Sequence, residues 1–229
     1  MAHARPSVGR EMSKDEVVAR LGEQRVLPLF TCASVDDGMK VVAALHGAGL
    51  RAVEFTNRRP EALDVFAAMA RRAVVDFPDL LLGAGTILDA AQAEAFHAAG
   101  ASFLVAPHLD EETGAYCASR GLAWCPGTGT VTEMVRAWRL GAAAAKVFPA
   151  DALGGPKFLE AVRGPCPFLR LMPSGGVTAE PTNLAGWFAA GAWCVGIGTK
   201  LVCPKEIAAG AFDAIGAKAR ALVAALPGR

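Results

Sequence analysis

A lysine interrupts a short apolar segment that has the composition of a buried strand. Lys146 follows four alanines at 142–145 and precedes Val147 and Phe148, and Pro149 ends the segment. Burying an unpaired ammonium group is costly, and a desolvated lysine amine is a nucleophile toward carbonyl carbons. The alternative is a lysine at an exposed strand end that reaches water or pairs with Glu54 or Asp151.

A carboxyl group occupies a similar position in a second apolar segment. Glu54 lies within residues 52–56, Ala-Val-Glu-Phe-Thr. If both strands face one lumen, this carboxyl can move protons while the amine of Lys146 forms a carbinolamine and then an imine. The alternative is a structural Lys–Glu pair. Arg58 offers a guanidinium fork suited to a carboxylate, and alternation from Glu54 favours Arg58 over Arg59 as the inward residue.

Two glycine-rich turns follow the last two predicted strands. Residues 173–176 read Pro-Ser-Gly-Gly and residues 196–199 read Gly-Ile-Gly-Thr. Bare backbone N–H groups at such turns can hold a phosphate, with hydroxyl donors from Ser174 and Thr199. The alternative is that the glycines only make tight turns.

The elements that position these residues alternate along the chain. Strands are expected at residues 25–31, 52–56, 80–84, 102–106, 122–125, 143–148, 169–172 and 193–197. Helices are expected at 34–46, 60–76, 89–99, 111–120, 130–140, 156–163, 180–190 and 205–226, after an extra N-terminal helix that Ser13 and Glu16 cap. Eight apolar strands alternating with helices predict an α/β fold, a closed (β/α)8 TIM barrel. An open Rossmann-like or flavodoxin-like sheet is the runner-up, but Gly83-x-Gly85 lacks the third glycine of a dinucleotide fingerprint.

Length and composition limit the remaining possibilities. The 229 residues fit one barrel domain at 11–229 after a loose tail at 1–10, and 53% of them are hydrophobic. The formal net charge of +1 argues against binding of nucleic acid or an anionic membrane, so the expected partner is a small molecule. The six cysteines form no C-x-x-C pair, which indicates free thiols in the cytoplasm. His108 is the one histidine expected at the strand ends and has no ligand cluster around it, so we expect neither a metal nor another cofactor.

In a barrel the residues just after each strand form the working face. Besides those already described, the strand ends supply Thr31, Thr86, Pro107 and His108, and Pro107 is expected to contact the substrate.

The combination resembles the 2-keto-3-deoxy-6-phosphogluconate (KDPG) and 4-hydroxy-2-oxoglutarate (KHG) aldolases, class I lyases of barrel fold. The similarity spans residues 17–202, through the segments 53–58 (VEFTNR), 83–86 (GAGT), 126–127 (PG), 146–150 (KVFPA), 173–177 (PSGGV) and 198–199 (GT). It implies Lys146 as the Schiff-base lysine and Glu54 as the general acid and base. It also implies a pyruvyl carboxylate site at Arg58 and Thr86, Phe148 beside the imine, a phosphate site at Gly175, Gly176, Gly198 and Thr199, no metal cofactor, and a homotrimer.

Two departures from the family pattern concern the far end of the substrate. Ala106-Pro107-His108 stands where the family commonly has Ser-Pro-Gly, and Lys200 stands where tryptophan is frequent. The resemblance predicts cleavage of a 2-keto-4-hydroxy acid, most simply KDPG, to pyruvate and glyceraldehyde 3-phosphate. The galactonate epimer and KHG remain alternatives as substrates. So do a phosphosugar isomerase or epimerase that uses Glu54 as a base, and a ligand-binding barrel without catalysis.

Overall fold

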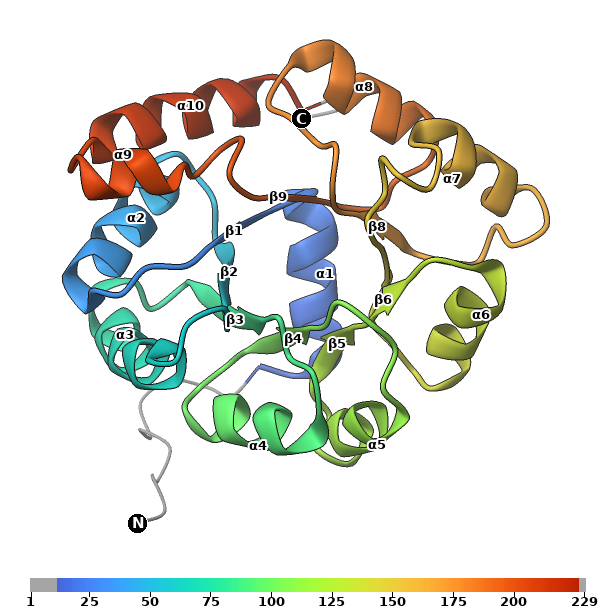
Figure 1. Cartoon of the computed structure of the whole chain (residues 1–229), viewed down its shortest axis with the longest axis horizontal. Helices are drawn as coiled ribbons and strands as arrows, with labels where there is room; N and C mark the ends of the chain where they lie inside the picture. Colours follow the sequence, from blue (N-terminus) through green and yellow to red (C-terminus); the bar gives the residue numbers. More distant parts are fainter. Residues whose placement is uncertain (1–11, 227–229) are drawn as a thin grey trace.

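Short parallel strands alternate with helices along the chain (Figure 1). The computed structural model describes residues 12–226, so the tail expected at 1–10 lies outside the described residues. The strands are β1 (Val26–Phe30), β2 (Ala52–Thr56), β3 (Leu81–Gly85), β4 (Phe103–Val105), β5 (Ala123–Cys125), β6 (Gly127–Thr128), β7 (Ala145–Val147), β8 (Leu171–Pro173) and β9 (Val195–Ile197).

The strands close into a ring. One sheet has the order β5-β4-β3-β2-β1-β9, and a second has the order β6-β7-β8. Pro126 separates β5 from β6, and the Lys146 N–H donates to its carbonyl oxygen at 2.8 Å, so β5 and β6 act as one strand beside β7. A parallel bridge between Ser174 and Gly196 joins β8 to β9. Counting β5 and β6 together, the described residues form the eight strands of a (β/α)8 barrel, which confirms the expected fold.

Helices surround this ring. They are α2 (Val35–Gly47), α3 (Ala62–Asp76), α4 (Ala90–Ala98), α5 (Glu111–Ser119), α6 (Val131–Arg139), α7 (Pro156–Arg163), α8 (Pro181–Ala189), α9 (Pro204–Ala208) and α10 (Phe212–Ala224). Side-chain caps from Ser34, Asp89, Asp110 and Thr130 fix the starts of α2, α4, α5 and α6. Among residues 12–226 no helix is long and apolar enough to cross a membrane.

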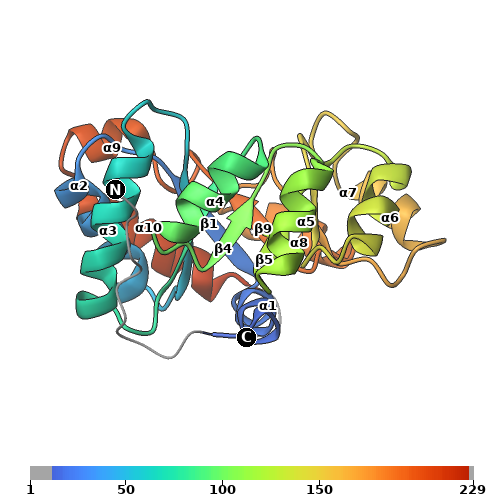
Figure 2. The same cartoon turned by 90° about the horizontal axis from the view of Figure 1, so that it is seen from below.

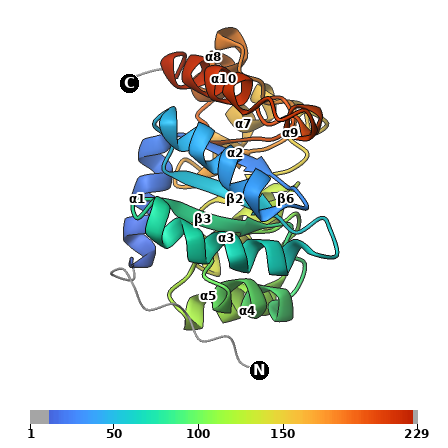
Figure 3. The same ribbon diagram turned by 90° about the vertical axis from the view of Figure 1, so that its left-hand side faces the viewer.

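The extra N-terminal helix, α1 (Lys14–Gln24), closes the end of the barrel where the strands begin. In Figures 2 and 3 it lies across that end, and in Figure 1 it is visible through the ring. Its apolar residues Val17, Val18 and Leu21 pack with lumen side chains such as Leu27 and Phe103. Because one end is filled in this way, a ligand would have to reach the lumen from the other end, where the strands finish.

The barrel has two cores, as the alternation of strand residues requires. Inward residues of the strands form the lumen cluster with α1, whereas outward residues such as Val53, Phe55 and Val147 pack beneath the helices. Glu54 and Lys146, which point inward, therefore lie above the apolar side chains of the lumen cluster.

Two expected helix boundaries are wrong. Residues 205–226 were expected to form one helix, but α9 and α10 are separated near Gly210, which has a φ of +68° that an α-helix cannot accommodate. Pro60 was expected in the first helical turn of α3, but it precedes the helix in a turn, and α3 begins at Ala62.

Candidate active site

Lys146 is a buried lysine on the lumen side of β7. Only 6% of its surface is exposed, so the alternative of a solvent-exposed strand end is wrong. Its strand neighbours are Gly127 and Met172, and its ammonium makes no hydrogen bond or ion pair with any residue in 12–226. Nζ lies 5.1 Å from the centroid of the Phe148 ring, which is a cation–π distance. Apart from this ring, the amine has no partner among the described residues.

Glu54 faces the same lumen from β2, several strands away around the ring. It is 1% exposed, and its neighbours in the sheet are Leu29 and Gly83. Burial raises the pKa of the carboxyl, while the positive charges of Lys146 and Arg58 act in the opposite direction. Within the described residues Glu54 and Lys146 form no direct ion pair. The carboxyl can therefore hold a proton at a pH where an exposed glutamate would have lost it.

Two glycines allow close contacts at this level of the barrel, a role that was not expected from the sequence. A Cβ at Gly85 would overlap the Glu54 carboxylate, and a Cβ at Gly127 would overlap the Pro107 carbonyl. Gly85 lies two residues after Gly83 and therefore shares its inward face, which is the signal that could have revealed the role. The absence of a side chain at Gly85 thus leaves the space that the Glu54 carboxylate occupies.

Arg58 lies at the rim of this space, next to Thr86. Its Nε donates to Thr86 Oγ1 at 3.4 Å, whereas Arg59 turns to Glu61, with Nε to Oε1 at 2.5 Å. Thr86 has a φ of +60°, a left-handed conformation that is uncommon for threonine and that directs the chain sharply away from β3. Arg58 and Thr86 thus present a guanidinium and a hydroxyl together.

The turn after β4 also lies at this end. Pro107 is partly buried and packs against Gly127, as described above. His108 is exposed, and its Nε2 lies 3.0 Å from the Leu88 carbonyl, so it joins the loops that follow β3 and β4. Thr31, at the end of β1, has a buried hydroxyl without a hydrogen-bond partner among the described residues.

The two glycine turns lie side by side, because the Ser174–Gly196 bridge joins the ends of β8 and β9. Gly175 and Gly176 have φ of +98° and +72°, and the Gly176 carbonyl accepts from Asn183 Nδ2 at 3.1 Å. Thr199 is exposed beside Gly198.

Asp151 lies against this pair of glycines. Its Cβ is 2.5 Å from where a Cβ at Gly176 would be. Asp151 forms no ion pair with Lys146 among the described residues, so the proposed Lys146–Asp151 alternative is also wrong.

No group of three His, Cys, Asp or Glu side chains within 12–226 is arranged to hold a metal ion. The site instead combines a buried amine, a buried carboxyl, a guanidinium at the rim and two glycine turns. Such a set can form an imine with a keto acid, move protons around it and bind an anionic tail.

Comparison with known proteins gives a consistent result. Residues 17–218 match the family described as KDPG and KHG aldolase. The 2-dehydro-3-deoxy-phosphogluconate aldolase of Treponema pallidum is 35% identical over 191 residues, which cover 83% of this chain and 88% of that protein.

Two solved structures are also similar. The KDPG aldolase of Legionella pneumophila, with pyruvate captured as a covalent carbinolamine, is 27% identical with a TM-score of 0.81, covering 90% of this chain and 97% of that chain. A chain of a cube-shaped protein cage designed by fusing symmetric oligomeric domains is 29% identical with a TM-score of 0.78, covering 88% of this chain and 71% of that one.

Proposed function

The chain belongs to the KDPG and KHG aldolase family, and on that premise we propose that Lys146 and Glu54 carry out its reaction, the cleavage of a 2-keto-4-hydroxy acid to pyruvate and an aldehyde. The observation that supports this most strongly is the Lys146 amine, which is buried in the barrel lumen without a hydrogen bond or an ion pair to any residue in 12–226. Lys146 is the one buried lysine among residues 12–226. A carbinolamine, as captured with pyruvate in the Legionella relative, forms when an amine adds to a keto carbon.

The first half of the reaction joins the substrate to the enzyme. The neutral Lys146 amine attacks the C2 keto carbon, and the keto oxygen takes up a proton to give a carbinolamine. Protonation of this hydroxyl by Glu54 allows water to leave, and a cationic imine remains between Nζ and C2. Because burial raises the pKa of Glu54, its protonated form is available for this step.

The second half breaks the carbon–carbon bond. Glu54, now ionised, accepts the proton of the C4 hydroxyl, directly or through water. The C4 oxygen forms the aldehyde carbonyl, and the electrons of the C3–C4 bond pass into the imine to give an enamine. Protonation at C3 and hydrolysis of the imine release pyruvate and return the free Lys146 amine.

The remaining residues bind the two ends of the substrate. Arg58 and Thr86 would hold the carboxylate next to C2, because a guanidinium and a hydroxyl suit a planar anion. Pro107 and Phe148 would pack along the chain of the substrate. Ser174, Gly175, Gly176, Gly198 and Thr199 would bind a distal phosphate through backbone N–H and hydroxyl groups.

The cellular compartment and the oligomeric state of the enzyme are part of the same proposal. The six cysteines are free thiols, which fits the reducing cytoplasm. We infer that several copies assemble, three by the family resemblance, and the similarity to a chain of a designed oligomeric cage supports assembly.

A cleavage panel tests the substrate assignment. KDPG, its galactonate epimer and KHG are each incubated with the enzyme, and pyruvate release is followed. We expect KDPG to give the highest kcat/KM. A phosphate-free analogue of KDPG should have a higher KM and a nearly unchanged kcat. Equal kcat/KM with and without phosphate would contradict the glycine-turn assignment, and an absence of pyruvate from all three acids would contradict the aldolase reaction itself.

A further inference from the structure

Thr31, at the end of β1, carries a buried hydroxyl that no described residue satisfies. Its Oγ1 is closed off from water and has no hydrogen-bond partner among residues 12–226. The buried hydroxyl of Thr56, on the neighbouring strand, instead donates to the Phe30 carbonyl at 3.3 Å. Because a buried hydroxyl without a partner destabilises the folded state, a partner from outside the chain is expected for Thr31.

The Thr31 side chain faces the barrel lumen. Its neighbours Phe30 and Cys32 both pack in the apolar core beneath the helices. Because side chains of an extended segment alternate between its two faces, the residue between them points the other way, like Leu27 in the lumen cluster. Thr31 as a whole is partly exposed, and rotation between the staggered positions about its Cα–Cβ bond can turn the hydroxyl toward a ligand at the strand ends.

The strand order places Thr31 between two parts of the proposed site. In the sheet, β1 lies between β2 and β9 (Figure 1). Leu29, the preceding inward residue of β1, is paired with Glu54 in the register, and its Cδ1 would lie 3.1 Å from a Cβ at Gly198. Thr31 is the next inward residue toward the strand ends. It therefore lies between the carboxyl proposed to transfer protons and a glycine turn proposed to bind phosphate.

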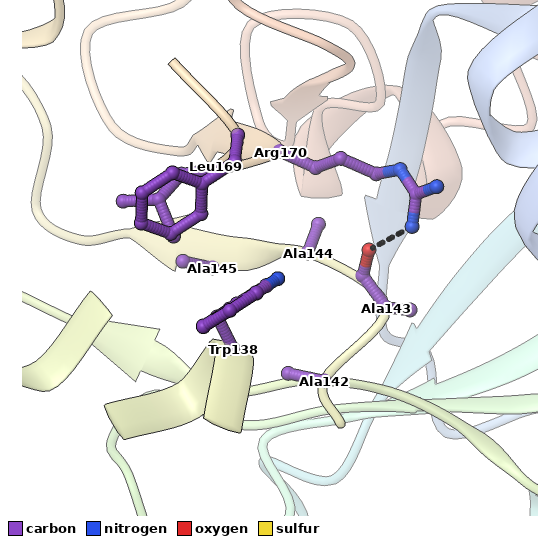
Figure 4. Close-up of a pocket in the computed structure, with 8 residues that line it drawn as sticks. Trp138, Ala142, Ala143, Ala144, Ala145, Leu169 and Arg170 are labelled. Carbon is purple, nitrogen blue, oxygen red and sulfur yellow. Dashed lines mark hydrogen bonds between the residues drawn. The ribbon is translucent and has the colours of Figure 1, made fainter. Parts of the chain in front are cut away.

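A cavity beside Trp138 does not offer the substrate another place. Its volume is about 140 Å³, and the Trp138 ring and the Arg170 side chain border it (Figure 4). Ligand pockets measure about 300–1,000 Å³. The cavity lies where β7 and β8 begin, and none of the residues proposed to bind the substrate lines it. The substrate is therefore expected at the other end of the strands, where Thr31 lies.

We propose that the Thr31 hydroxyl binds the C5 hydroxyl of the substrate and thereby selects for it. This inference rests on the proposed cleavage reaction, in which Glu54 accepts the proton of the C4 hydroxyl and the glycine turns hold the C6 phosphate. C5 lies between C4 and C6 in the substrate, just as Thr31 lies between the groups that bind them. Each hydroxyl can donate and accept, so the contact satisfies Thr31 and favours a substrate that carries a C5 hydroxyl over one that lacks it.

The reverse reaction, aldol addition to pyruvate, tests this contact with two aldehydes. One is glyceraldehyde 3-phosphate, whose C2 hydroxyl becomes the C5 hydroxyl of the product, and the other is 3-oxopropyl phosphate, which lacks that hydroxyl. In Thr31→Val we expect kcat/KM for glyceraldehyde 3-phosphate to fall by roughly 2- to 10-fold, the worth of one neutral hydrogen bond. The value for 3-oxopropyl phosphate should stay at that of the wild type. The Tm should not fall, because the lost hydroxyl has no partner in the free protein.

Two control variants separate recognition from a structural effect. Thr31→Ser retains a hydroxyl and should retain the preference for glyceraldehyde 3-phosphate. Thr56→Val removes a hydroxyl that has an internal partner, so it should lower Tm and leave the ratio of the two kcat/KM values unchanged.

The outcomes distinguish this inference from the proposed function. An unchanged ratio of the two kcat/KM values in Thr31→Val, or a lower Tm of that variant, would overturn the role of Thr31 while the aldolase reaction stands. A wild type that forms no aldol product with either aldehyde would overturn both the reaction and the role of Thr31.

Discussion

The buried position of Glu54 suits proton transfer but lowers the stability of the folded state when the carboxyl is ionised. Its pKa in the folded chain lies above its ordinary value of 4.5, because burial disfavours the carboxylate. Between these two values the folded state binds more protons than the unfolded state, so the stability that depends on Glu54 falls as pH rises through this window. Below 4.5 the carboxyl is protonated in both states and this effect vanishes.

Glu54→Gln should therefore separate activity from stability. We expect kcat to fall by about 10²–10⁴-fold, as for loss of a general acid–base group. The free energy of unfolding of the variant, relative to the wild type, should increase as pH rises above 4.5, as urea unfolding at several pH values would reveal. A difference in stability that shrinks with rising pH would contradict the assigned direction of the pKa shift.

Gly85 should be required because of the space it leaves for Glu54. A methyl group in Gly85→Ala would overlap the Glu54 carboxylate and displace it. We expect kcat/KM to fall by at least about tenfold, equivalent to about 1.4 kcal/mol of transition-state stabilisation. Gly47→Ala, at the end of α2 with nothing within 4 Å of the added carbon, is the matched control and should retain wild-type activity. Full activity in Gly85→Ala would show that Glu54 has a different working position.

Among the elements, α1 stabilises the end of the barrel where the strands begin, opposite the proposed site. Gln24 Nε2 donates to the carbonyls of Val26 and Ala52, both at 2.7 Å. Its Oε1 accepts from the N–H groups of Arg51 and Ala52. One side chain thus joins the helix to the beginnings of β1 and β2.

Gln24→Leu should lower stability without changing catalysis. The buried backbone groups that lose their partners cost about 1–3 kcal/mol each. At the lower limit, the four groups together cost about 4 kcal/mol, which would lower Tm by roughly 8–16 °C in a chain of this size. We expect kcat and KM at 25 °C to stay at wild-type values, with exposed Glu23→Ala as the control that leaves Tm unchanged. A variant with unchanged Tm and impaired kcat would contradict the separation of the two barrel ends.

Most elements could be predicted from the sequence, because their ends carry local signals. Ser34, Asp89 and Thr130 cap helices where the sequence analysis expected helices to begin. The break near Gly210 was missed, since a single glycine within a helical pattern is often tolerated and its φ depends on packing. In the site, too, a role that depends on packing could not be predicted from the sequence. Lys146 stood out by its apolar context, but the role of Gly85 depends on a side chain of the neighbouring strand.

At the scale of the whole molecule, the closed barrel protects its thiols. Cys32, Cys117 and Cys125 are buried, and burial raises their pKa values to about 11, 12 and 12. Burial also raises the pKa of Cys194. Thiols react as thiolates, so these groups are unreactive in the folded chain. Cys203 is the partly exposed cysteine among the six.

A thiol titration should reveal this protection. With a disulfide reagent at pH 8, we expect about one thiol per chain to react while the protein is folded, and all six after unfolding in guanidinium chloride. Cys203→Ser should remove the reactive thiol from the folded protein and serves as the control. Rapid reaction of several thiols in the folded state would contradict the burial of these cysteines.

In the proposed reaction, Lys146 forms the covalent link to the substrate. The most direct measurement is reduction with borohydride in the presence of pyruvate, followed by peptide mass spectrometry. We predict a reduced pyruvyl adduct on Lys146, and no adduct on that peptide when pyruvate is omitted or when Lys146→Arg replaces the wild type. An unmodified Lys146, or an adduct on another lysine together with full activity of Lys146→Arg, would contradict the account.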